Sequence, residues 1–128
     1  MHDLDALLAE VDRHFDRAPE VQVCWASAKQ LRETVGTPFN TWGLAWRTSA
    51  GRFIGINLRL KCAPRYVLKY LIFHERLHTV SPPRVSVNDL AEKRTFKHHR
   101  AFRLAERVWP DYVRANAWLD ANESRVLR

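Results

Sequence analysis

Residues 64–79 read PRYVLKYLIFHERLHT, and this stretch decides the fold. Its opening proline suits the first turn of a helix, and the helix that follows is apolar on most of its circumference. At 100° per residue, Arg65, Lys69 and Arg76 fall in one narrow stripe, which we expect to be the exposed side. A helix of this kind is buried at the centre of a domain, so the remaining elements are expected to pack around it.

Within this helix, His74, Glu75 and His78 form an HExxH sequence. Spacing of four places the two imidazoles on one face, about 40° apart, where both can bind one zinc ion. Glu75 lies one residue further round and is expected to act as the general base on the attacking water. These polar groups would be costly on an apolar buried helix unless they were paired or bound metal. The competing interpretation is a pair of core histidines that hydrogen-bond to backbone groups.

A catalytic zinc site needs a third protein ligand, and the downstream candidates are Asp89, Glu92, His98, His99 and Glu106. On a helix running to Trp109, His98 projects with Phe102 on the apolar side, whereas His99 points toward the basic side. Helix geometry therefore favours His98 as the third ligand. The alternative is that His98 is only a packed or surface histidine.

The other segments predict an α+β fold with a small three-stranded sheet, antiparallel or mixed, packed on the central helix. Their order is a helix over residues 3–17, a strand near 21–25, a helical turn near 27–34, a hairpin of strands over 39–46 and 53–58, and helices ending at Trp109 and covering 112–119. No repeat or linker divides the chain, so residues 1–128 are expected to form a single domain.

The charge is concentrated in the second half of the chain. The net charge is +7, and residues 65–128 hold thirteen Lys or Arg against seven Asp or Glu. A basic half attracts acidic partners, nucleic acid above all, although a merely solvated basic surface explains the composition equally well.

Cysteine usage and apolar runs indicate the compartment. Cys24 and Cys62 are far apart and are expected to be small buried thiols, which argues against a disulfide framework or a cysteine zinc ribbon. The acidic first residues predict no signal peptide, and no apolar run approaches the roughly 18 residues of a membrane helix. We therefore expect a cytoplasmic protein with no membrane association.

Several short motifs follow one another along the chain: Thr41-Trp42-Gly43, Ile54-Gly55-Ile56-Asn57 with Leu60, the apolar run before His74, His98-His99-Arg100-Ala101-Phe102, Pro110-Asp111-Tyr112, and Trp118-Leu119. Together they resemble the SprT-like zinc metallopeptidases, including the minimal bacterial forms, over about residues 39–119. The resemblance implies a compact zincin fold, endopeptidase chemistry and His98 as third ligand through a His-x-x-x-Phe spacing. Some members of that family cleave proteins bound or crosslinked to DNA.

Two features depart from the family. The chain ends without the cysteines of the usual zinc ribbon, and Arg76 occupies a position that is commonly apolar. Zincins also pair a strand edge with extended peptide, and by analogy residues 53–57 are expected to provide that edge.

The leading interpretation is zinc-dependent hydrolysis of a protein or peptide substrate, including proteins associated with DNA. A second interpretation is a zinc-stabilised nucleic-acid-binding module with little or no catalysis, supported by the basic residues between 93 and 107. The intact Glu75 argues against it, because a structural zinc site does not need that carboxylate. A third is a metal-dependent amidase for a small molecule, which only the shape of the cleft would distinguish.

Overall fold

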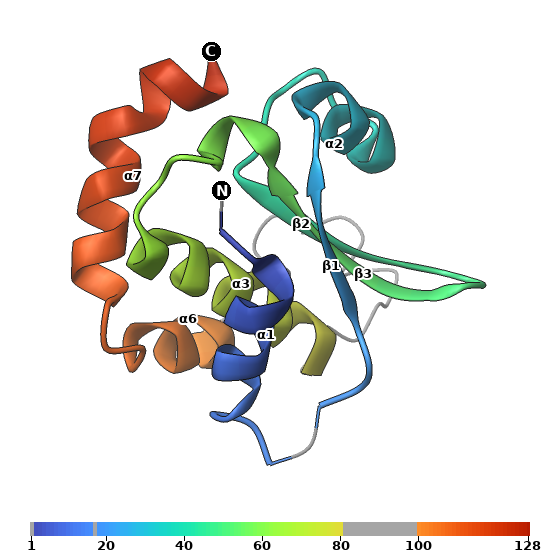
Figure 1. Cartoon of the computed structure of the whole chain (residues 1–128), viewed down its shortest axis with the longest axis vertical. Helices are drawn as coiled ribbons and strands as arrows, with labels where there is room; N and C mark the ends of the chain where they lie inside the picture. The colour runs from blue at the N-terminus through green and yellow to red at the C-terminus, as the bar shows by residue number, and fades with distance from the viewer. Residues whose placement is uncertain (1, 17, 81–99) are drawn as a thin grey trace.

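The computed structural model describes residues 2–16, 18–80 and 100–128 (Figure 1). Two helix–strand pairs and a third strand come first, and only helices follow the sheet within the described residues. The elements in chain order are α1 (Leu4–Asp12), β1 (Gln22–Ala26), α2 (Ala28–Val35), β2 (Gly43–Thr48), β3 (Gly51–Asn57), the 3-10 turn η1 (Leu58–Leu60), α3 (Arg65–Val80), α6 (Arg100–Arg107) and α7 (Tyr112–Leu127).

The three strands form one mixed sheet in the order β1-β3-β2. The central strand β3 runs parallel to β1 and antiparallel to β2, with Ile54 opposite both Val23 and Ala45. The predicted α+β class, with a small sheet and a hairpin of β2 and β3, is confirmed. The prediction that residues 53–57 offer a free edge is wrong, because β3 uses both of its edges within the sheet.

Helices cover both faces of the sheet, with α2 on one side and α1, α3, α6 and α7 on the other (Figure 1). Successive residues of β3 point to opposite faces. Ile54 and Ile56 are fully buried in the core that includes α3. Gly55 faces the α2 side, where an added Cβ would lie 3.1 Å from Leu31 and 3.0 Å from the Trp46 ring. The missing side chain therefore lets the Trp46 ring lie against the sheet.

The central helix α3 begins directly after Pro64 and is buried along most of its length, as its composition predicts. The predicted exposed stripe is only partly correct. Arg65 is exposed, but Arg76 is 2% exposed, and its Nε donates to Oδ1 of Asp12 at 2.8 Å. The reason is that α1 lies along this side of α3 and supplies carboxylates to it: Asp12 pairs with Arg76, and Glu10 pairs with Arg65 and Lys69.

Several other boundaries differ from the sequence prediction. Helix α1 ends at Asp12 rather than near residue 17, and β2 begins at Gly43 rather than near residue 39. The turn predicted after β1 is a full helix, α2, with a capping box at Ser27. The prediction of buried thiols is wrong, because both cysteines are exposed. Among the described helices, none combines the length and apolar character needed to cross a bilayer.

Candidate metal centre

Helix α3 brings the three HExxH side chains together. His74 and His78 are half-buried with ring centroids 5.3 Å apart, and Glu75 is 6% exposed. One ligand atom from each of His74, Glu75 and His78 lies within 4.8 Å of the other two. The predicted residues therefore form a group that could hold a metal ion.

Helix α6 packs one aromatic ring against both histidines. Phe102 is 4% exposed, and its ring stacks on that of His78 with centroids 4.4 Å apart and 29° between planes. The same ring meets His74 edge-on at 5.2 Å. This confirms that the apolar side of the predicted helix around Phe102 faces the HExxH helix. His98, the predicted third ligand, lies outside the described residues, as do Asp89, Glu92 and His99.

Glu106, one turn after Phe102 on α6, contacts His74 directly. Its Oε2 meets Nδ1 of His74, and the Glu106 side chain is only 13% exposed. A carboxylate can only accept, so Nδ1 carries the proton and Nε2 of a neutral His74 is left with its lone pair. The sequence predicts Glu106 only as a candidate direct metal ligand, not as a partner of His74. The signal for this contact was available, because Glu106 follows Phe102 by four residues and therefore shares its helix face.

Electrostatics at this contact favour the charged form of His74. Burial lowers the pKa of His74, but the hydrogen bond to Glu106 and the charges of Glu75 and Glu106 outweigh it, so the pKa is raised. Tyr70 lies beside the same carboxylate. Burial raises the pKa of Tyr70 well above its usual range, and Glu106 adds to the rise although a hydrogen bond with Asn116 opposes it. Tyr70 is therefore a neutral phenol within a polar network that ends on His74.

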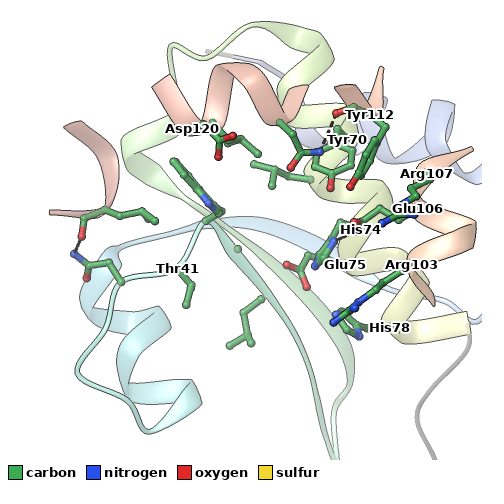
Figure 2. Close-up of a pocket in the computed structure, with 18 residues that line it drawn as sticks. Thr41, Tyr70, His74, Glu75, His78, Arg103, Glu106, Arg107, Tyr112 and Asp120 are labelled. Carbon is green, nitrogen blue, oxygen red and sulfur yellow. Dashed lines mark hydrogen bonds and ion pairs between the residues drawn. The ribbon is translucent and has the colours of Figure 1, made fainter. Parts of the chain in front are cut away.

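The three side chains open onto a pocket of about 700 Å³ (Figure 2). Its walls come from the segment 40–44, which leads into β2, and from α3, α6 and α7. The lining includes five apolar side chains besides the aromatic tyrosines: Trp42, Leu44, Leu71, Leu119 and Leu127. Charged side chains lie toward the two ends, with Arg103 and Arg107 on the α6 side and Asp120 on α7 (Figure 2).

The wall beside Glu75 is the backbone of β2. A Cβ added at Gly43 would lie 3.5 Å from Oε2 of Glu75 and 2.8 Å from the backbone oxygen of Gly55. No side chain larger than glycine fits there without movement, so β2 can run directly past the Glu75 carboxylate. In the sequence Gly43 is recognisable only as part of the Thr41-Trp42-Gly43 motif, and this close approach to β3 and Glu75 is its physical reason.

Comparison with protein-family models, with curated proteins and with solved structures finds no match to this chain. What the site does must therefore be argued from its own geometry.

Proposed function

We propose that this protein is a zinc-dependent metallopeptidase in which Glu75 acts as general base. One observation carries the proposal. The ligand atoms of His74, Glu75 and His78 converge within 4.8 Å on a buried helix, at the side of a pocket large enough for peptide side chains. Two histidines that only filled a core would not be expected to border such a pocket.

The donor set fits zinc. Imidazole nitrogen is a common zinc ligand, and the two histidines sit one turn apart on one face of α3. Glu106 engages Nδ1 of His74, which leaves Nε2 as the donor atom and resembles the carboxylate–histidine pairs that orient metal ligands. His98 completes the proposed ligand set on the strength of its spacing from Phe102, and the fourth position is then available to water and substrate.

When bound, zinc supplies a Lewis acid that polarises the scissile carbonyl and makes water acidic enough to attack near neutral pH. Glu75 takes a proton from the attacking water while the oxygen of that water bonds to the carbonyl carbon of the substrate. The C–N bond then breaks, and Glu75 returns the proton to the departing amine. The low exposure of Glu75 keeps bulk water from competing for this proton.

The outer edge of β2 supports an extended peptide as substrate. Asn57 N–H donates to the Trp42 carbonyl at 2.9 Å, so this opposed pair is hydrogen-bonded across the ladder. Alternation in an antiparallel ladder then directs the N–H and C=O groups of Gly43 and Ala45 away from β3. Among the described strands none pairs with that edge. We expect a peptide to pair there, which would bring its backbone past Glu75.

The test is metal analysis combined with a general protease assay. Wild-type protein purified without chelator is expected to contain about one zinc per chain and to cleave unfolded casein. Glu75→Gln should keep the metal and lose hydrolysis by orders of magnitude, because it removes a proton acceptor and no proposed ligand. Wild-type protein that takes up no zinc would refute the proposal, and full turnover by the variant would assign the base elsewhere.

The third ligand is tested with a matched pair of adjacent variants. His98→Ala should sharply reduce zinc affinity and abolish cleavage, whereas His99→Ala should retain both, because the sequence pattern puts only His98 on the same helix face as Phe102. Retention of zinc by His98→Ala would show that the third ligand is a different residue.

A further inference from the structure

Two arginines of α6 line the proposed catalytic pocket. Arg103 and Arg107 are four residues apart, so they lie on one face of the helix, and both are exposed. In Figure 2, Arg103 and Arg107 project from α6 on the side of the pocket that also holds His78 and Glu106. Their positive charges therefore lie on one side of the place where the scissile bond would lie.

Neither guanidinium is neutralised by a carboxylate of the described residues. Throughout residues 2–16, 18–80 and 100–128, no carboxylate lies within ion-pair distance of Arg103 or Arg107, whereas Arg65, Arg76 and Arg114 each have one. An exposed arginine on an outer surface is commonly just solvated. These two differ because they share a pocket with the HExxH group.

The carboxylates of the pocket do not cancel this charge. Glu106 is engaged by His74, and Glu75 lies against β2 in the metal group. Asp120 lines the same pocket but belongs to α7, at the other end (Figure 2). The α6 wall is consequently the cationic wall of the pocket, and a bound metal ion would add further positive charge beside it.

The ligand that fits this wall is a carboxylate attached to a peptide. Guanidinium groups bind carboxylates through two parallel hydrogen bonds. The rest of the described lining combines leucines and aromatic rings with polar side chains, which suits a peptide. Nucleic acid is less well matched, because its affinity comes from many phosphate contacts along an extended surface, whereas the described lining of this pocket offers two cations.

We propose that Arg103 and Arg107 select peptide substrates that carry Asp or Glu close to the scissile bond. This inference rests on the proposed peptidase function and specifies its substrate class. A substrate paired with β2 would present alternate side chains to the two walls of the pocket, and the acidic one would face α6.

The experiment uses a synthetic dodecapeptide library with randomised central positions and the full-length, zinc-loaded protein. Cleavage sites of the wild type are expected to be enriched in Asp and Glu on one side of the scissile bond. For the best peptide, replacing that acid by its amide should lower kcat/KM about 10-fold, as loss of a charge-assisted hydrogen bond does. The selection should weaken with added salt.

The matched variants are R103E/R107E and Lys61→Glu. Lys61 is exposed and lies outside the pocket, so its reversal should leave the acid-to-amide ratio unchanged. The pocket double variant should lose the preference or reverse it toward Lys and Arg. Far-UV circular dichroism and zinc content confirm that each variant is folded and loaded.

Failure of this inference is distinguishable from failure of the peptidase function. If the wild type cleaves acidic and amide peptides equally, or if the double variant keeps the preference, the inference is overturned and the peptidase function stands. If nothing is cleaved, capture of the same library on zinc-loaded Glu75→Gln protein still decides it: enrichment of acidic peptides supports the selection and its absence overturns it. Binding of a single-stranded 20-mer DNA that depends on the two arginines, without any acidic preference, also overturns it and assigns them to nucleic acid.

Discussion

Removal of the Glu106 carboxylate is expected to weaken zinc binding although Glu106 is not a proposed ligand. Its Oε2 contacts Nδ1 of His74, and the two side chains are 13% and 21% exposed, so water replaces the contact only in part. Loss of such an outer partner typically costs 10- to 100-fold in metal affinity, or about 1.4–2.7 kcal/mol. We expect Glu106→Gln to lower zinc affinity about 10-fold, because the amide oxygen can still accept a hydrogen bond, and Glu106→Ala to lower it about 100-fold.

The assay is competition for zinc against a chromophoric chelator at pH 7.5, with Glu123→Gln as the control. Glu123 is exposed on α7 and outside the pocket, so its change should leave the affinity alone. The visible spectrum of the cobalt-substituted protein separates two roles for Glu106. An unchanged band pattern with weaker binding indicates that Glu106 orients His74, and an altered pattern indicates a direct ligand. Zinc affinities of both Glu106 variants within twofold of wild type would refute the reasoning.

Three further outcomes follow from the same structure. Asp12→Ala should lower the free energy of unfolding by about 3 kcal/mol in urea titration, because it leaves the buried Arg76 guanidinium without its carboxylate; a loss under 1 kcal/mol would mean that water reaches the arginine. Gly43→Ala should lower the free energy of unfolding by about 1–3 kcal/mol in the same titration and reduce cleavage, since its Cβ would lie 2.8 Å from a backbone oxygen of β3. A variant as stable as the wild type would show that β2 shifts freely. In metal-free protein the raised pKa of His74 contributes stability that is fully present below about pH 6.5 and is lost as the pH rises through the folded-state pKa. Between pH 6 and 8 the Tm of the wild type should therefore fall more than that of Glu106→Gln, and parallel Tm profiles would contradict this.

The central helix and its HExxH group could be predicted from sequence because both depend on local periodicity. The apolar circumference of residues 65–80 identifies a buried helix whatever packs against it, and four-residue spacing alone brings His74 and His78 to one face. Helix periodicity also predicted that Phe102 lies on the apolar side of its helix, which agrees with its burial. These features need no knowledge of which elements are neighbours.

What could not be predicted depends on neighbours. The strand over Gly51–Asn57 has the same sequence pattern whether it lies at an edge or at the centre of the sheet, and only the parallel addition of β1 makes it central. That addition transfers the exposed edge, and with it the expected substrate position, to β2. Arg76 likewise has the pattern of a solvent-facing residue until α1 is placed over it with Asp12.

The placement of α1 and α6 bears directly on how the proposed site is held. Three polar side chains of α3 each contact a carboxylate on another helix. Lys69 contacts Glu10, Arg76 contacts Asp12, and His74 contacts Glu106. Apolar packing alone would tolerate a small rotation of α3, because so much of its circumference is apolar. The carboxylates on α1 and α6 oppose this rotation, because turning α3 toward one of these helices would lengthen its contact with the other. The Asp12–Arg76 pair on one side, in which only the arginine is fully buried, and the Glu106–His74 pair on the other therefore hold the rotation of α3, and this rotation sets how His74 and His78 face the pocket.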